Sequence, residues 1–257
     1  MSYLDAIILG ILQGLTEFLP VSSSGHLVLT QALLGVKEPG VAFELLVHLG
    51  TLLAVVIYFR HRLGRLVASL FHRDRKPERA VVGYLVIGTV PAGVAGVLFK
   101  DFFEGAFSNP LMTAMMLFAT GLILLSTYLV PAGRRDVSVI SSVVMGLGQA
   151  LAIMPGISRS GSTIAAGMLT GVKPSEAAEF SFLLAIPAIA GAVAFKVDEL
   201  LELKSQLAGQ YLVGTIVSFL FALVAVYTVL AVIKRGKFQY FAYYCFAAGA
   251  VGLYLFL

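Results

Sequence analysis

The stretch LGILQGLTEFLPVSSSGHLVLTQALLGVK, residues 9–37, is apolar at both ends and interrupted in the middle. Pro20 and Gly25 frame the interruption, with three consecutive serines between them. The apolar part that follows, residues 27–36, has ten residues, and a helix of that length rises about 15 Å, half the thickness of a bilayer core. Non-helical backbone at membrane depth is tolerated only where it is buried in protein or lines a wet cavity. We therefore expect residues 1–36 to form a re-entrant hairpin, which enters a membrane and leaves it on the same side.

A second stretch has the same organisation. Residues 137–154 are apolar, PGISRSGST follows at residues 155–163, and residues 164–172 are again mainly apolar. The two stretches align without gaps at an offset of 136 residues, with ten identities over 28 aligned positions. The identities include the pairs Gln13 with Gln149, Ser22 with Ser158 and Gly25 with Gly161. We interpret this as an internal duplication and expect a second re-entrant hairpin at residues 137–172.

The rest of the chain is dominated by long apolar segments. Of the 257 residues, 59% are hydrophobic and 12% are charged, whereas a soluble domain carries roughly 25% charged residues. This composition excludes a cytosolic enzyme and predicts an all-α integral membrane protein that forms a single membrane domain over residues 1–257. Six segments have the length of about 20 residues that a membrane span needs. They are residues 41–59, 80–99, 110–130, 175–195, 209–233 and 238–257.

The duplication predicts two halves of opposite orientation. Residues 1–130 and 137–257 each contain one hairpin and three spans, and because three is odd, the second half is inverted relative to the first. The hairpins then enter from opposite faces and meet near the midplane, as in inverted-repeat transporters. The alternative is that residues 3–21 and 137–154 are complete spans joined to short interfacial helices.

The cations of the chain concentrate in three connections between spans. By the positive-inside rule these connections are cytoplasmic, which places both termini on the outer side. They also account for the net charge of +4, so we expect no nucleic-acid partner. The start of the chain has no basic segment of the kind that opens a cleavable signal peptide. The cations are Arg60, Arg62, Arg65, Arg73, Arg75, Lys76 and Arg79, then Arg134 and Arg135, then Lys234, Arg235 and Lys237.

Two charged residues lie inside the interrupted stretches. Glu17 and Arg159 are costly at membrane depth, about 2.5 to 3.5 kcal/mol each on an insertion scale, and such residues mark functional sites. Gln13 lies four residues before Glu17 and therefore on the same helix face. We expect Glu17 to hold a divalent cation, with substrate oxygens and water completing its shell. We expect His48, in a plain apolar span, to be a packed or weakly paired residue, and Glu44 is a weaker candidate for lining the cavity.

The two serine turns predict a pair of anion sites. Each turn precedes a short helix, whose N-terminal N–H groups favour negative charge, and Arg159 adds a fork that binds phosphate through two parallel bonds. Two such cradles beside a carboxylate favour a multiply charged phosphate group. Ser23 and His26 are three residues apart, so we predict a nucleophile and its base. The remaining substrate-binding candidates are Gln13, Ser22, Ser24, Gly25, Ser158, Ser160 and Thr163.

These motifs resemble a known family. Residues 13–26, QGLTEFLPVSSSGH, resemble the E/Q-x-x-x-E block and Ser/His turn of the undecaprenyl-pyrophosphate phosphatases associated with bacitracin resistance. Residues 155–163 match that family's PGxSRSxxT block at every fixed position. The resemblance implies a bacterial inner-membrane enzyme that removes one phosphate from the C55 isoprenoid diphosphate and returns the monophosphate to peptidoglycan assembly. It also implies a required divalent metal ion, Mg²⁺ or Ca²⁺, and a site that opens to the outer side.

The resemblance assigns roles to several residues. Glu17, His26 and Arg159 become catalytic residues, and Ser23, Ser158 and Thr163 the hydroxyls around the phosphates. Gln13 stands where the family pattern allows Glu or Gln, and it brings no negative charge to a metal.

Some alternatives stay open. His26 itself is a second candidate for the nucleophile, in place of Ser23. A transporter or flippase of a phosphorylated lipid fits the same architecture, whereas an intramembrane Ser/His protease has no use for Arg159. The expected partners are a polyprenyl diphosphate and membrane lipids. A homodimer is one candidate for the oligomeric state.

Overall fold

The computed structural model describes residues 1–35, 41–72, 74–198 and 205–257, and regular secondary structure in this part is helical. The predicted all-α fold is confirmed. Lys37, Arg73 and the charged residues at positions 199–204 lie outside the described residues. The helices are α1 (Tyr3–Phe18), α2 (Ser23–Leu34), α3 (Val41–Tyr58), α4 (Arg60–Phe71), α5 (Lys76–Leu98), α6 (Lys100–Phe107), α7 (Pro110–Ser126), α8 (Val139–Leu151), α9 (Arg159–Leu169), α10 (Pro174–Phe195), α12 (Ala208–Lys234) and α13 (Tyr240–Phe256).

The chain is an integral membrane protein. Within the described residues, α5, α7 with the turn that follows it, α10 and α12 are long and apolar enough to cross a membrane. A fifth span is formed if α3 and α4 count together, although they are bent by 77° at Phe59. The last predicted span, α13, has 17 residues, which is the short limit for crossing a hydrocarbon core. Helix α4 makes up much of the first basic connection, and because of the bend at Phe59 it turns sharply away from α3.

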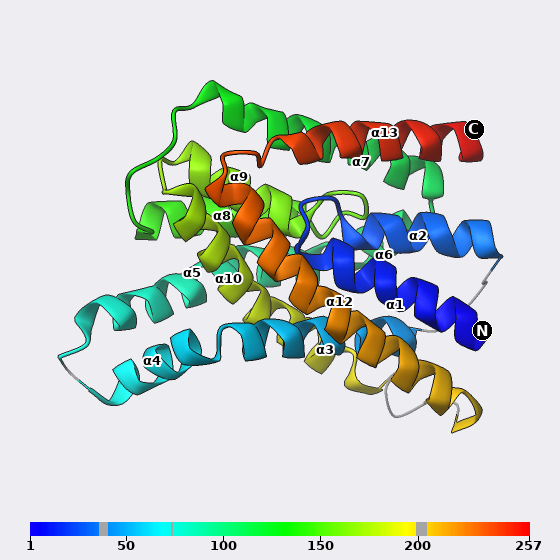
Figure 1. Ribbon diagram of the computed structural model, residues 1–257, viewed down its shortest axis with the longest axis horizontal. Helices are drawn as coiled ribbons and strands as arrows, with labels where there is room; N and C mark the ends of the chain where they lie inside the picture. Colours follow the sequence, from blue (N-terminus) through cyan, green and yellow to red (C-terminus); the bar gives the residue numbers. More distant parts are fainter. Residues whose placement is uncertain (36–40, 73, 199–204) are drawn as a thin grey trace.

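The first broken segment is a helical hairpin. α1 ends at Phe18 and α2 begins at Ser23, so the break lies at the predicted Pro20. Ser22 caps α2 by accepting a hydrogen bond from the Gly25 amide at 3.2 Å. It does so with a φ of 69°, and it is the one non-glycine residue with positive φ in the described chain. In Figure 1 α2 lies beside α1 and returns toward the side that carries both chain termini.

The second broken segment also closes on itself. The Arg135 amide donates to the Gly171 carbonyl at 3.1 Å, and the Lys173 amide donates to the Arg135 carbonyl at 2.9 Å. The residues just before α8 and just after α9 therefore lie side by side. This geometry is that of a helical hairpin, and its re-entrance into a membrane stays a prediction. In Figure 1 the hairpin starts and ends on the side opposite the termini.

Each hairpin packs its first helix against a long helix of the other half. α1 packs on α12, and α8 packs on α5. The contacts need glycine at aligned positions. A Cβ at Gly10 would lie 2.6 Å from the Gly214 carbonyl oxygen, and one at Gly146 would lie 2.5 Å from that of Gly88. This equivalence supports the predicted duplication, while the boundaries of the two repeats stay a prediction.

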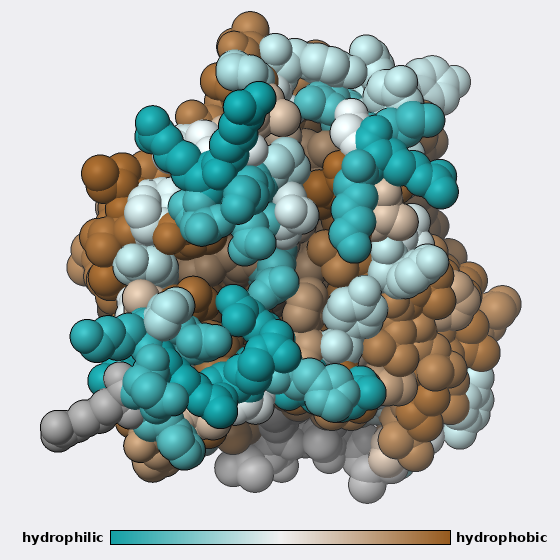
Figure 2. Space-filling model, turned by 60° about the vertical axis from the view of Figure 1, so that its left-hand side comes forward, coloured by the Kyte–Doolittle hydropathy of each residue, from teal (hydrophilic) through white to brown (hydrophobic). Residues whose placement is uncertain are grey.

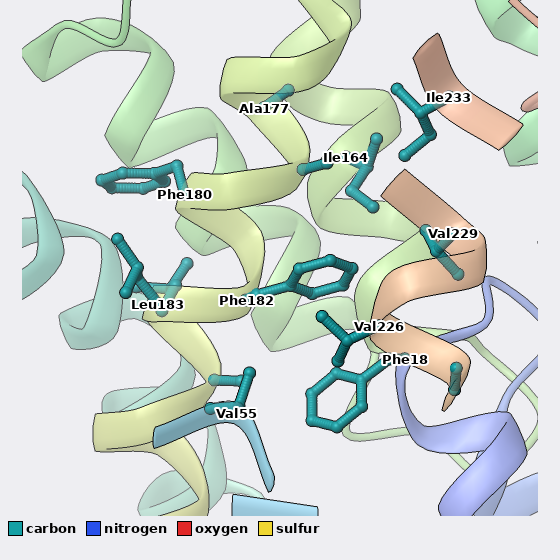
Figure 3. Close-up of a cluster of buried hydrophobic side chains, with 14 of the residues drawn as sticks. Phe18, Val55, Ile164, Ala177, Phe180, Phe182, Leu183, Val226, Val229 and Ile233 are labelled. Carbon is teal, nitrogen blue, oxygen red and sulfur yellow. The ribbon is translucent and has the colours of Figure 1, made fainter. Parts of the chain in front are cut away.

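An apolar core lies directly beside the hairpin tips. Phe18 contacts Phe182 edge to face, with ring centroids 5.4 Å apart. Figure 3 shows these rings among Val55, Ile164 and Val226, so that α1, α3, α9, α10 and α12 meet at one point. Since Phe18 is buried here, the rotation of α1 about its axis is fixed. That rotation holds the neighbouring Glu17 inside the protein.

Candidate active site between the hairpin tips

The two charged residues of the hairpins are in direct contact. Arg159, the first residue of α9, donates from Nη2 to Oε1 of Glu17 at 2.7 Å. Glu17 lies in the last turn of α1 and is only 7% exposed. A buried carboxylate needs a compensating charge or a full set of hydrogen bonds. The predicted meeting of acid and guanidinium is therefore present in the structure.

The second carboxylate oxygen of Glu17 has three neighbours. Oε2 accepts hydrogen bonds from Gln13 Nε2 at 2.9 Å and from Ser23 Oγ at 2.6 Å. His48 Nε2 lies 3.7 Å from the same oxygen. This long contact fits the expectation that His48 is a packed or weakly paired residue, and the structure identifies Glu17 as its partner. Glu44 lies one turn earlier on α3, where it accepts a hydrogen bond from Gln31 Nε2 on α2 at 3.0 Å.

Arg159 is held from two further sides. Its Nη1 donates to the carbonyl of Ser181 on α10 at 3.4 Å, and its Cζ lies 5.8 Å from the centroid of the Phe18 ring. Thr163 Oγ1 shares a hydrogen bond of 2.6 Å with Ser181 Oγ and also donates to the Arg159 carbonyl at 2.8 Å. Ser181 is therefore a site residue that the sequence analysis missed. Thr163 lies behind the guanidinium and is fully buried.

The two serine turns are built alike. Ser158 accepts a hydrogen bond from the Gly161 amide at 3.0 Å, as Ser22 does from Gly25 in the first hairpin. The hydroxyls of Ser158 and Ser160 lie 3.3 Å apart, and so do those of Ser22 and Ser24.

The turns also touch each other. Ser160 Oγ donates to the Leu19 carbonyl at 3.0 Å, and a Cβ at Gly25 would lie 3.0 Å from Cα of Gly156. Ser22, Ser158 and Ser160 are 1–2% exposed. Their hydroxyls join and cap the tips in this structure, and the partly exposed serines of the turns are Ser23 and Ser24.

The predicted pairing of Ser23 with His26 is wrong in this structure. His26 Nδ1 lies 2.8 Å from the carbonyl of Ser22, and Nε2 lies 2.8 Å from the hydroxyl of Tyr244 on α13. A carbonyl can only accept, so Nδ1 carries a proton and Nε2 of the neutral ring accepts from Tyr244. The ring also stacks on Tyr244 with centroids 5.6 Å apart. The bond to the carbonyl four residues back turns the imidazole toward α13, while Ser23 turns toward Glu17.

A mainly apolar groove begins at His26 and Tyr244. It runs between α2 and α13 and has a volume of about 370 Å³. Its polar end therefore borders the Ser22–Ser23 turn, and the rest offers an apolar surface. The lining residues of α13 include two small side chains, Ala247 and Ala248, and those of α2 include Leu29 and Leu33.

The site offers oxygen ligands for a cation but no cluster of three metal-binding side chains. Across the described residues, no three His, Cys, Asp or Glu side chains gather in a way that could hold a metal ion. Gln13 Oε1, however, is buried without a hydrogen-bond partner, beside Glu17. A carboxylate and an amide oxygen fit Mg²⁺ or Ca²⁺ if phosphate oxygens and water supply the rest of the shell.

The fold and the site define a class. This is a helical membrane protein in which two hairpin tips bring together a carboxylate, a guanidinium and partly exposed serine hydroxyls. The sequence model of the bacitracin resistance protein BacA family matches residues 6–251, and the chain belongs to this family.

Relatives that carry the name undecaprenyl-diphosphatase are similar along nearly their whole length. The one from Salinibacter ruber is 43% identical over 99% of this chain and 100% of its own. The one from Syntrophotalea carbinolica is 43% identical over 98% of both chains. A third, from Methanobrevibacter smithii, is 40% identical over 98% of this chain and 96% of its own.

Proposed function

We propose that this protein hydrolyses undecaprenyl diphosphate to undecaprenyl phosphate and inorganic phosphate, which recycles the lipid carrier for cell-wall synthesis. The observation that carries the proposal is the contact of Glu17 with Arg159 beside the Ser23 hydroxyl. Phosphoryl transfer depends mainly on positioning and charge stabilisation, and this cluster provides both. The names of the relatives support the same activity.

The geometry favours Ser23 as the nucleophile and Glu17 as its base. Ser23 Oγ attacks the terminal phosphorus, the bond from that phosphorus to the bridging oxygen breaks, and undecaprenyl phosphate leaves. The Ser23 proton passes to Glu17 Oε2, which already accepts its hydrogen bond at 2.6 Å. Water then hydrolyses the phosphoserine. His26 lies at the other end of the turn, where its tautomer is set by Ser22 and Tyr244.

Arg159 links substrate binding to the strength of this base. In the structure its guanidinium neutralises Glu17, and a carboxylate paired in this way is a weak base. A diphosphate competes for the same fork through two parallel hydrogen bonds. Binding of the head group thus releases Glu17 at the moment when the Ser23 proton has to be accepted.

A divalent cation, Mg²⁺ or Ca²⁺, belongs to the proposal. Glu17 and Gln13 Oε1 would hold it, and when bound it supplies positive charge for the diphosphate oxygens. Gln13 is neutral, so its part is that of an oxygen ligand. The buried amide oxygen without a partner is the feature that supports this assignment.

The groove between α2 and α13 accommodates the prenyl chain. It is apolar along its length and meets the polar turn at His26, so one lipid can place its tail there and its head group at Ser23.

The charged end of the molecule supports the proposed orientation. Figure 2 shows hydrophilic side chains gathered at the end away from the termini, with apolar surface beside them. This end carries the basic connections, which the positive-inside rule assigns to the cytoplasm. The first hairpin and the termini then face the outer side of a bacterial inner membrane. The homodimer stays a prediction.

The deciding experiment is phosphate release from C55 prenyl diphosphate by the purified protein. We expect release with Mg²⁺ or Ca²⁺, loss of it with a chelator, and loss in a Glu17→Gln variant that is otherwise folded. A wild-type protein that moves the lipid across proteoliposomes without releasing phosphate would be a flippase instead. Trapping of the phosphoenzyme identifies the nucleophile, because phosphoserine is stable in acid and phosphohistidine is not.

A further inference from the structure

The Glu17 carboxylate is contacted by a third helix outside the two hairpins. His48 lies in the middle of α3, and its Nε2 is 3.7 Å from Glu17 Oε2. Gln13, Ser23 and His48 thus converge on one carboxylate oxygen, whereas Arg159 takes the other. The His48 side chain is 27% exposed against 6% for Glu17, so it is the part of this contact that reaches open space.

The His48 ring is fixed on its other side. Its Nδ1 lies 2.7 Å from the Glu44 carbonyl, and since a carbonyl only accepts, Nδ1 is the donor there. The Nε2 atom therefore carries an N–H toward Glu17 in the imidazolium form of the ring, the form in which His48 and Glu17 are an ion pair. The backbone around it is also held. A Cβ at Gly50 would lie 2.5 Å from the Thr215 carbonyl oxygen on α12, and Ser218 Oγ donates to the Val47 carbonyl at 2.9 Å. The ring therefore points at the carboxylate because of both its own hydrogen bond and the close packing of α3 on α12.

The two histidines of the region occupy different environments. His26 uses both ring nitrogens on Ser22 and Tyr244 and borders the apolar groove. His48 uses one nitrogen on its own helix and turns the other toward Glu17. Glu17 Oε2 accepts the hydrogen bond of Ser23, and the imidazole that lies beside this oxygen is consequently that of His48.

We propose that His48 is a positioning residue for Glu17. It keeps Oε2 directed at the Ser23 hydroxyl when a bound diphosphate draws Arg159 away from Oε1. Without His48, only Gln13 and Ser23 would orient the carboxylate, and both belong to the same hairpin as Glu17 itself. The proposal rests on the hydrolase function proposed above.

The test compares two substitutions at position 48. His48→Gln keeps an N–H donor on a side chain of similar reach, whereas His48→Leu keeps the volume and removes the donor. We expect His48→Leu to lower kcat at least about 10-fold with little change in KM, and His48→Gln to keep most of the wild-type kcat. His61→Leu, on the exposed start of α4, is the matched histidine control and should leave kcat unchanged.

A second measurement separates positioning from a merely structural role. In a Glu17→Gln background, His48→Leu should cause no further loss of residual kcat, because the carboxylate it positions is gone. Thermal unfolding shows that the compared variants are folded, and His48→Ala replaces His48→Leu if the latter is not.

Two outcomes overturn the proposal. The first is a folded His48→Leu or His48→Ala protein with wild-type kcat. The second is a loss of kcat that is equal in His48→Leu and His48→Gln and that adds to the loss caused by Glu17→Gln in the double variant. Failure of the hydrolase assignment is distinguished from both, because the wild-type protein itself then releases no phosphate.

Discussion

Arg159 Nη2 and Glu17 Oε1 form a 2.7 Å hydrogen bond between residues that lie 142 positions apart in the chain. The bond joins the end of α1 to the start of α9, so each hairpin supplies the counter-charge of the other. Because Glu17 is 7% exposed, removal of the arginine alone leaves a buried carboxylate unpaired.

This pair predicts a non-additive effect on stability. Arg159→Gln should lower the free energy of unfolding by roughly 3–5 kcal/mol, and the double variant Glu17→Gln/Arg159→Gln should be more stable than Arg159→Gln. Both should lose phosphate release by at least about 100-fold. Thermal unfolding in detergent and phosphate release are the measurements. An Arg159→Gln protein no less stable than the double variant would contradict the buried pairing.

Substitutions of Ser23 and Ser158 should distinguish a catalytic hydroxyl from a hydroxyl that caps a helix. Ser23→Ala removes the hydroxyl that donates to Glu17, and we expect a folded protein whose kcat falls by at least about 100-fold. Ser158→Ala removes the cap of α9 and should cost about 1 kcal/mol of stability. If Ser23→Ala retains turnover and still forms a phosphoenzyme, the nucleophile is another residue.

The glycines of the helix crossings test the equivalence of the two hairpins. Gly10→Ala and Gly146→Ala each place a methyl group within 2.6 Å of a backbone carbonyl oxygen, so each should lose about 1–3 kcal/mol of stability. Gly93→Ala is the matched control, since a Cβ there meets nothing within 4 Å. It should be neutral or gain up to about 1 kcal/mol from helix propensity. Tolerance of alanine at one hairpin but not the other would argue against equivalent packing.

The break at Pro20 and the meeting of Glu17 with Arg159 were predictable because their causes are local. A proline followed closely by a serine run and a glycine favours a break in a helix, and a charge at membrane depth needs a partner. The duplication predicts two hairpins that meet, and the sequence has one of these two charges in each hairpin. The positions of these two side chains therefore follow from the sequence and the cost of burying them.

The ring orientations of the two histidines were not predictable in the same way. Whether His26 reaches Ser23 depends on Tyr244, which is 218 residues away. Whether His48 faces Glu17 or lipid depends on how α3 is rotated against α12, and an apolar helix with little amphipathic pattern does not fix that rotation. The rule that polar residues within spans mark functional sites would nevertheless have favoured His48. Ser181 carried no such indication, because its contact with Arg159 is made by its backbone carbonyl.

The groove between α2 and α13 makes a prediction about where the tail of the lipid lies. Ala247 lines the groove on its open side, so Ala247→Phe should fill part of the surface on which the prenyl chain lies. Each buried CH₂ is worth about 0.8 kcal/mol, and loss of two of them raises KM for a C55 diphosphate by about 10-fold. A C15 diphosphate, whose tail also passes Ala247 one turn beyond Tyr244, should show a comparable rise in KM. Ala250→Phe, an exposed position of α13 that does not line the groove, is the control. An unchanged KM in Ala247→Phe, or an equal rise in Ala250→Phe, would place the tail elsewhere, whereas a rise confined to Ala247→Phe would locate the tail along α13 with its head group at Ser23.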